Sequence, residues 1–512
     1  MAEATKEPPT LAARIGLWLG PLAAIVLWSM PTVGSWLAVD LQLKPVDQPL
    51  NAMAGAFAWM AIWWLTEAIP LAATSLLPLV LFPLLEIQPV KEVAAAYGDH
   101  NIFLFLGGFL IALAIEQAGL HKRLALTIVY IMGDNPARLL LGFMLATALM
   151  SMWISNTATT LLMLPIATSI LAVADLKLIN ESSRKNLGIG LMLGIAYSAS
   201  IGGVATLVGT PPNIAFASFY RDTFPNEPNV SFLAWMLMAL PFSAVFLFVA
   251  WAVLGYLLYP VSSKESLGGR AVILDELHKL GPLSAAEWRV GAVFFATALL
   301  WILREPVEGW GWGMAFVTED GKQYVSDATT AIAMAVLCFL IPRGGQSEPR
   351  QPLLNWDVTV KVPWGVLLLF GGGTALAKAV KASEFDLYLG SHMASLMSDM
   401  SHSAMVVVTA TGMIWLTEFT SNLASVQTFN PVLGSASQEL GVPPLLLLVP
   451  ATLAASCAFM MPVATPPNAI VYGSGRVPIG KMVKAGIVLN IISIILVSTT
   501  VLVLGRILIG SA

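Results

Sequence analysis

Ser155-Asn156-Thr157-Ala158-Thr159-Thr160 is a run of small, mostly hydroxylated residues inside a strongly apolar region, and Leu161-Leu162-Met163-Leu164-Pro165 follows it directly. A polar run at membrane depth persists only where it faces protein or a water-filled cavity. A second version lies downstream, at Thr417-Glu418-Phe419-Thr420-Ser421-Asn422-Leu423-Ala424-Ser425. Two copies of one polar break indicate a duplicated chain that closes around a single site.

The composition is that of a membrane protein. Of the 512 residues 57% are hydrophobic and 11% are charged, whereas a soluble domain is about 25% charged. Many windows of about 20 residues, the length that spans a bilayer core, contain few charges. We therefore predict an all-α polytopic protein embedded in the lipid bilayer of the cell (inner) membrane. The basic residues are scattered along the chain, so no nucleic-acid partner is expected.

The order of spans and polar connections predicts about 11 transmembrane helices plus two re-entrant hairpins. In chain order we expect a cytoplasmic N-terminus at 1–14, N-terminal scaffold helices at 15–100, a first inverted repeat at 101–259 with a hairpin at 137–172, a cytoplasmic linker at 260–288, scaffold helices at 289–362, and a second inverted repeat at 363–508 with a hairpin at 403–436. Spans at 187–208 and 444–462 are each expected to run into a Thr-Pro-Pro-Asn break, because consecutive prolines cannot continue a regular helix.

The two halves share three landmarks in the same order. The offsets are 264, 266 and 255 residues for the pairs Gly107 and Gly371, Asn156 and Asn422, and Thr210 and Thr465. Such an order is typical of the internal repeats of secondary transporters. The glycine pairs are expected to be sites of close helix packing.

The basic residues predict the orientation. With the N-terminus in the cytoplasm, the 26 lysines and arginines divide into 18 inside and 8 outside, in accordance with the positive-inside rule. Lys361 falls inside, while Lys378 and Lys381 fall outside. This orientation places the mouth of the first hairpin inside and that of the second outside, so the repeats are expected to be inverted.

If the two hairpin tips meet near the midplane, Asn156 and Asn422 come together. Helix N-termini there would present backbone N–H groups to carboxylates, and helix C-termini and unwound carbonyls would suit a small cation. Neither motif contains Arg or Lys, so a co-bound cation is expected to balance an anionic substrate. The alternative is that these small residues only pack helices. Glu67, Glu116 and Glu418 are acidic residues near predicted spans and are expected to accept structural hydrogen bonds, with a proton relay as the alternative.

The chain resembles the divalent anion/sodium symporter family, which includes sodium-coupled di- and tricarboxylate and sulfate carriers. The resemblance covers about 15–508. It is most specific at Ala455-Ser456-Cys457-Ala458-Phe459-Met460-Met461-Pro462-Val463-Ala464-Thr465-Pro466-Pro467-Asn468-Ala469-Ile470-Val471, and the paired Ser-Asn-Thr motifs and Thr-Pro-Pro breaks support it. It implies a homodimer in which each protomer has a scaffold part and a mobile part and works as an elevator.

The resemblance also implies site residues. Sodium ions would bind at a first site made by Ser151, Ser155, Asn156 and the backbone near Gly209, and at a second made by Thr417, Thr420, Asn422 and the backbone near Ala464. The substrate carboxylates would meet Asn156, Thr157, Thr210, Asn422, Thr465 and Pro466. One position departs from the usual pattern: Leu423 stands where bacterial dicarboxylate carriers usually have threonine.

The predicted function is sodium-coupled uptake of a C4-dicarboxylate such as succinate, malate or fumarate. One alternative is a sodium-independent dicarboxylate exchanger of the same fold, and another is a sodium-coupled citrate or sulfate carrier. A membrane enzyme or a receptor-like binder is disfavoured, because no nucleophile–base pair or metal-ligand set is visible in the sequence.

Overall fold

The computed structural model describes residues 10–29, 49–133, 135–177, 181–228, 230–260, 269–304, 311–320, 323–344 and 351–505. Within these ranges every regular element is helical, and the extended pairings are two isolated bridges. The predicted all-α class is confirmed. The predicted segments at 1–14, 15–100, 101–259, 260–288, 289–362 and 363–508 lie partly outside the described residues.

The helices of the first half are α1 (Leu11–Ser29), α3 (Pro49–Thr66), α4 (Leu71–Thr74), α5 (Leu77–Leu84), α6 (Val90–Ala96), α7 (His100–Ala118), α8 (Leu120–Met132), α9 (Pro136–Ser151), α10 (Asn156–Lys177), α11 (Glu181–Gly203), α12 (Pro211–Thr223) and α13 (Phe232–Ala252), which continues as the π-helix η1 (Val253–Leu258). Helix α14 (Gly269–Leu280) follows in the predicted linker.

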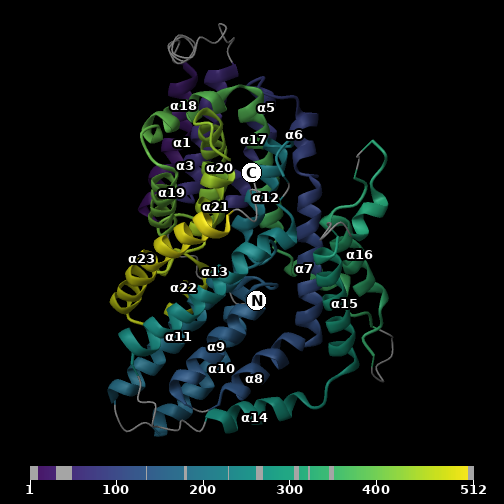
Figure 1. Ribbon diagram of the computed structural model, residues 1–512, viewed down its shortest axis with the longest axis vertical. Helices are drawn as coiled ribbons and strands as arrows, with labels where there is room; N and C mark the ends of the chain where they lie inside the picture. The colour runs from purple at the N-terminus through teal and green to yellow at the C-terminus, as the bar shows by residue number, and fades with distance from the viewer. Residues whose placement is uncertain are drawn as a thin grey trace.

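The helices of the second half are α15 (Ala285–Ile302), η2 (Trp312–Phe316), α16 (Asp327–Leu340), η3 (Trp356–Lys361), α17 (Trp364–Ala382), α18 (Phe385–Met397), α19 (His402–Thr417), α20 (Asn422–Glu439), α21 (Leu445–Ala455), α22 (Pro466–Gly473) and α23 (Ile479–Leu504). Figure 1 shows them side by side in one elongated bundle, with α8 and α14 across its lower end and α18 near its upper end.

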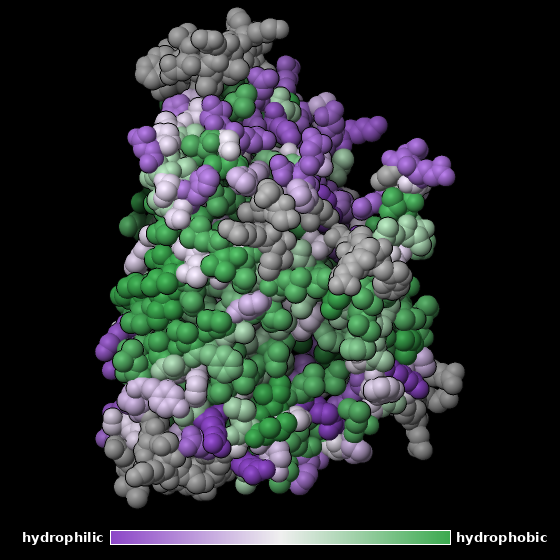
Figure 2. Space-filling model, viewed as in Figure 1, coloured by the Kyte–Doolittle hydropathy of each residue, from purple (hydrophilic) through white to green (hydrophobic). Residues whose placement is uncertain are grey.

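The described helices fit a membrane. Eight of them are long and apolar enough to cross a bilayer, and the number rises to nine if the bent pair α18–α19 counts as one span. Five further apolar helices are shorter, between 10 and 17 residues. Figure 2 shows a broad apolar band between two polar ends. A surface of this kind matches the hydrocarbon core of a membrane, so the chain is a multi-pass membrane protein.

The glycine landmarks are sites of close packing, as predicted. A Cβ atom on Gly107 of α7 would overlap the backbone of Ala331 in α16. On α17, a Cβ on Gly371 would overlap Tyr97, and one on Gly372 would overlap the backbone of Ser75. Only glycine permits these helices to approach so closely.

Each polar break separates two helices. α9 ends at Ser151 and α10 begins at Asn156, whereas α19 ends at Thr417 and α20 begins at Asn422. Figure 1 shows α9 and α10 in the lower part of the molecule and α19 and α20 in the upper part. The two breaks therefore approach the middle of the bundle from different ends.

Two predicted spans end earlier than expected. α11 stops at Gly203 instead of 208, and α21 stops at Ala455 instead of 462. The physical reason is that side chains bind the backbone groups that a continuing helix would have paired. The Asn213 amide binds the carbonyls after α11, and the Glu418 carboxylate binds the N–H groups after α21. The chain becomes helical again at the prolines that open α12 and α22, where the fixed φ of proline suits a helix start.

Candidate functional site

A cavity of about 730 Å³ lies where the two breaks meet. All four motifs contribute to its wall: Ser155, Asn156 and Thr157; Gly209, Thr210, Pro211 and Pro212; Ser421, Asn422 and Leu423; and Ala464, Thr465, Pro466 and Pro467. The structure thus brings Asn156 and Asn422 to one site, as the sequence predicts. Every predicted substrate-contacting residue lines this cavity.

The first break is fixed by its own side chains. The Ser151 hydroxyl donates a 2.5 Å hydrogen bond to Oδ1 of Asn156. Ser155 Oγ accepts a 3.3 Å bond from the N–H of Ala158 and so caps α10, as serine does at helix starts. The N-terminus of α10 therefore lies at the cavity wall with Asn156 held in one orientation.

The second break repeats this arrangement. Thr417 Oγ1 lies 2.6 Å from Oδ1 of Asn422 and 3.0 Å from the carbonyl oxygen of Ala455. The hydroxyls of Thr420 and Ser425 lie 2.7 Å apart. The N-terminus of α20 lies at the cavity wall, and Asn422 is oriented through the same atom as Asn156.

The Thr-Pro-Pro-Asn breaks match each other as well. Nδ2 of Asn213 donates to the carbonyls of Gly203 and Thr206, ten and seven residues earlier, at 3.4 and 2.8 Å. Nδ2 of Asn468 donates to the carbonyls ten and seven residues before it, those of Ala458 and Met461, both at 3.1 Å. The internal repeat extends to individual hydrogen bonds. Together the breaks place four helix N-termini, those of α10, α12, α20 and α22, around the cavity.

Oxygen atoms gather beside Asn156. A Cβ atom built on Gly203 would lie 2.6 Å from Asn156 Oδ1 and 3.2 Å from the carbonyl oxygen of Gly209. A Cβ built on Gly209 would come as close as 3.0 Å to the carbonyl oxygen of Met152. The absence of side chains at both glycines keeps this pocket open. Amide and carbonyl oxygens are the ligands that a hard monovalent cation prefers in transporters.

The predicted sodium ligands divide into two groups. Ser155, Asn156, Gly209, Asn422 and Ala464 line the cavity. The hydroxyls of Ser151, Thr417 and Thr420 do not: Ser151 and Thr417 are fully buried behind the asparagines that they bind, and Thr420 bonds within its own break. The resemblance predicts these three as sodium ligands, which stays a prediction; in the structure Ser151 and Thr417 hold Asn156 and Asn422 through hydrogen bonds.

Glu418 is completely buried and stabilises the second break. Its Oε1 accepts hydrogen bonds from the N–H of Phe459 at 2.8 Å and from Nδ2 of Asn490 at 2.7 Å. Its Oε2 accepts a 3.1 Å bond from the N–H of Met461. Hydrogen-bond donors surround the carboxylate, so the predicted structural role is confirmed.

Three charged residues that were not predicted as substrate or sodium ligands also line the cavity: Glu67, Glu116 and Lys361. Lys361 Nζ lies 3.6 Å from Glu116 Oε1, and both side chains are partly exposed, so the cavity reaches the surface here. Glu67 follows α3 with a φ of 49°. No hydrogen bond of the Glu67 carboxylate is present among the described residues, and the side chain lines the cavity, so its predicted structural role stays a prediction.

Paired helix breaks that close on one polar cavity inside an apolar bundle define the chain as a secondary transporter. Comparison with known proteins agrees. The family model for the sodium:sulfate symporter transmembrane region matches residues 43–511, and the chain belongs to that family. The predicted family is confirmed, and with it the prediction of a transporter and not an enzyme.

Relatives of the chain include the sodium-dependent dicarboxylate transporters SdcS of Staphylococcus aureus strains MRSA252 and NCTC 8325. Each is 40% identical over 511 residues, which cover 99% of this chain and 94% of the relative.

Two solved transporter structures share the fold at low sequence identity. The YdaH transporter of Alcanivorax borkumensis is 15% identical with a TM-score of 0.50, over 80% of this chain and 86% of that one. The antimetabolite efflux pump MtrF of Neisseria gonorrhoeae is 14% identical with a TM-score of 0.54, over 92% and 98%.

Proposed function

We propose that this chain couples the entry of sodium ions to the uptake of a C4-dicarboxylate such as succinate, malate or fumarate. The observation that carries the proposal is the pair of asparagines, Asn156 and Asn422, each held through Oδ1 at the start of a helix that lines one cavity. The names of the Staphylococcus aureus relatives support the choice of a dicarboxylate and of sodium.

The two carboxylates of the substrate would bind to amide and hydroxyl donors. With Oδ1 accepting a buried hydroxyl, Nδ2 is the atom of each asparagine that can donate to a carboxylate. Thr157, Thr210, Thr465 and the helix starts at Pro211 and Pro466 add hydroxyls and positive dipole ends. Two such groups, one on each repeat, suit a molecule with a carboxylate at each end.

Sodium ions would supply the countercharge. The motifs themselves provide no cation, and Lys361 lies at the cavity mouth beside Glu116. Holding a dianion in a low-dielectric site without nearby positive charge is costly. The first sodium would lie among Ser151, Ser155, Asn156 and the backbone near Gly209. The second would lie among Thr417, Thr420, Asn422 and the backbone near Ala464. Binding of sodium would therefore precede tight binding of the substrate.

The architecture that accompanies this function has further elements. Each protomer of a homodimer would carry 11 spans and two re-entrant hairpins, α9–α10 and α19–α20, in inverted repeats, with its N-terminus in the cytoplasm. The two hairpins and the broken helices would move as an elevator against the scaffold helices in the cell (inner) membrane. The arrangement of α8 and α18 at opposite ends of the bundle is consistent with this inversion.

The test is uptake of labelled succinate into proteoliposomes with and without a sodium gradient. Asn156→Ala and Asn422→Ala are expected to abolish sodium-dependent uptake. Asn186→Ala removes a half-buried asparagine that donates to the carbonyl of Pro260, away from the main cavity, and is expected to leave uptake unchanged. Normal transport by either motif variant would overturn the assignment.

A second arm separates symport from exchange and identifies the anion. Liposomes are loaded with or without internal dicarboxylate, and citrate and sulfate compete with succinate outside. Uptake that requires internal dicarboxylate and ignores sodium would identify an exchanger. Stronger competition by citrate or sulfate than by malate or fumarate would reassign the substrate within the same site.

A further inference from the structure

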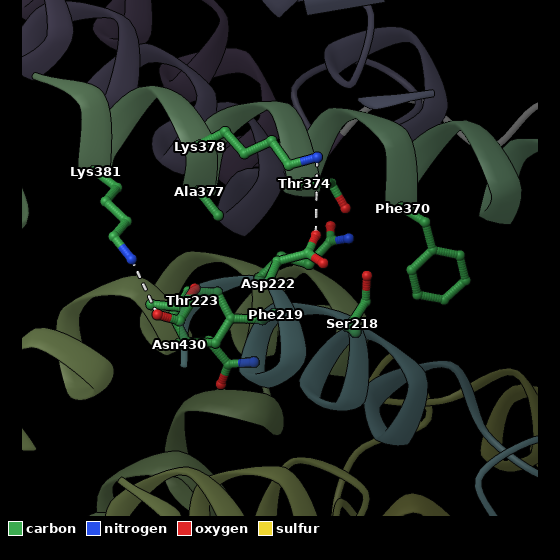
Figure 3. A pocket seen from close by; sticks show the side chains of 13 residues that line it. Ser218, Phe219, Asp222, Thr223, Phe370, Thr374, Ala377, Lys378, Lys381 and Asn430 are labelled. Atoms are coloured by element: carbon green, nitrogen blue, oxygen red, sulfur yellow. Dashed lines mark hydrogen bonds and ion pairs between the residues drawn. The ribbon is translucent and has the colours of Figure 1, made fainter. Parts of the chain in front are cut away.

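A second, narrow cavity of about 40 Å³ lies between α12, α17 and α20 (Figure 3). Its polar wall, which we name the polar seam, consists of Ser218 and Asp222 of α12, Thr374 and Lys378 of α17, and Gln427 and Asn430 of α20. The same three helices line the main cavity at their beginnings, with Thr210 to Pro212, Val366 and Leu369, and Ser421 to Leu423. The polar seam therefore begins where the main cavity ends.

The polar seam contains buried groups that lack partners. Asn430 is 1% exposed, and neither atom of its amide makes a hydrogen bond to the described residues. Oε1 of Gln427 is buried without a hydrogen bond as well. Burying an amide without a partner costs free energy. Polar side chains at membrane depth persist where they border a water-filled path, so these residues indicate a path that is hydrated in another state of the transporter.

The far end of the polar seam is closed by two contacts between α17 and α12, both drawn in Figure 3. Lys378 Nζ lies 3.9 Å from Oδ2 of Asp222, and Lys381 Nζ donates a 3.0 Å hydrogen bond to the carbonyl of Thr223. The side chains of the ion pair are 45% and 20% exposed. Exposed ion pairs of this kind are weak, so these contacts can break and re-form at little cost.

The two ends of α17 lie on opposite sides of the membrane. The main cavity reaches the surface beside Lys361, just before α17, whereas Lys378 and Lys381 lie in its last turns. With 19 residues the helix is about 28 Å long, close to the thickness of a bilayer core. The distribution of basic residues puts Lys361 inside and the other two lysines outside. In this predicted orientation the main cavity would be open to the cytoplasmic side and closed to the outer side.

We propose that the polar seam is the route by which the anionic substrate reaches the main cavity from the outer face, and that Lys378 and Lys381 attract it there when their contacts with α12 break. The identity of the anion rests on the proposed function, whereas the route does not. In the structure, the Asp222 carboxylate and the Thr223 carbonyl compensate the positive charges of the two lysines. Once these contacts break, a dianion approaching the outer face meets both charges. Lysines at the mouth of a cleft raise the local concentration of an anion.

The route is tested by labelling from outside. Thr374→Cys places a thiol in the polar seam of the full-length protein, where the native Cys338 and Cys457 are buried. A membrane-impermeant maleimide is then added to the outer face. Asp222→Asn or Lys378→Gln in this background is expected to raise the labelling rate up to about fivefold, the effect of losing one exposed ion pair. Lys484→Gln, an exposed lysine on α23, is the control and should have no effect. Equal labelling rates in all variants would overturn the route.

The attraction is tested by transport. The double variant Lys378→Gln, Lys381→Gln is expected to raise the KM for external succinate several-fold at low salt with kcat nearly unchanged, and Arg at both positions is expected to restore KM. An unchanged KM with intact wild-type uptake would overturn the role of the lysines and leave the proposed function standing. Faster labelling of the seam thiol in a protein that takes up no dicarboxylate would support the route and refute the proposed function instead.

Discussion

Thr417 donates a 2.6 Å hydrogen bond to Oδ1 of Asn422, five residues further along the chain. Ser151 has the same relationship to Asn156 at 2.5 Å. The hydroxyl that ends one helix thus determines the orientation of the amide that begins the next. Because Oδ1 is occupied, Nδ2 of each asparagine is directed to other acceptors, and a substrate carboxylate is the acceptor that the cavity can admit.

The first prediction concerns this pair of hydroxyls. Thr417→Ala or Ser151→Ala removes one hydrogen bond, worth about 1 kcal/mol, and allows the amide to rotate. We expect kcat/KM for succinate to fall about 3- to 10-fold, mainly through KM. Thr417→Ser and Ser151→Thr keep the hydroxyl and should retain most activity. Equal kinetics for the alanine and hydroxyl variants would show that the hydrogen bond does not orient the asparagine.

The second prediction concerns Glu418. Glu418→Ala leaves the N–H groups of Phe459, Met460 and Met461 buried without their acceptor. Each unpaired group costs about 1–3 kcal/mol, so we expect a loss of several kcal/mol in the free energy of unfolding. Thermal or denaturant unfolding in detergent measures this loss.

The control for Glu418 is Glu439→Ala. Glu439 is an exposed carboxylate at the end of α20, and its removal should change stability by less than about 0.5 kcal/mol. Asn490→Ala removes one donor to Glu418 and should have an intermediate effect. If Glu418→Ala were as stable as Glu439→Ala, the carboxylate would not be holding the segment after α21.

Glu418 also shows where sequence reasoning ends. The motifs predicted the helix breaks, the pairing of the two halves and the cavity that all four motifs share, because prolines and hydroxyls in apolar helices act locally. The early end of α21 depends on a carboxylate 41 residues away in the sequence, and no local pattern encodes such a contact. Likewise, Lys361 marks the cavity mouth only through its position beside Glu116. The resemblance names Ser151 and Thr417 as sodium ligands, which stays a prediction, whereas only the packing reveals that their hydroxyls bond to Asn156 and Asn422.

The third prediction tests the repeat. Asn213→Ala and Asn468→Ala each remove an amide that binds carbonyls ten and seven residues earlier. Because the two arrangements match, we expect similar losses of about 1–3 kcal/mol in unfolding free energy. We also expect each variant to lose stabilisation by added sodium, since a ligand stabilises only the state that binds it. Thermal shifts with sodium or choline measure both effects. A large loss in one variant and none in the other would contradict an equivalent role in the two halves.

The fourth prediction concerns Leu423, which is 6% exposed and lines the cavity beside Asn422. The matching position of the first motif is Thr157, so the cavity has a hydroxyl on one side and an apolar wall on the other. Leu423→Thr adds a hydroxyl that can bind a polar group of the substrate. One such hydrogen bond, worth about 1 kcal/mol, should raise the preference for malate over succinate about 3- to 10-fold, because malate carries a hydroxyl on the same carbon chain.

The matched control is Val366→Thr on the α17 wall, because valine and threonine have nearly equal shapes. Competition between labelled succinate and malate in sodium-driven uptake gives the ratio directly. A role for position 423 in substrate choice requires the ratio to change in Leu423→Thr and to stay constant in Val366→Thr, since a change in both would reflect only the added polarity of the cavity.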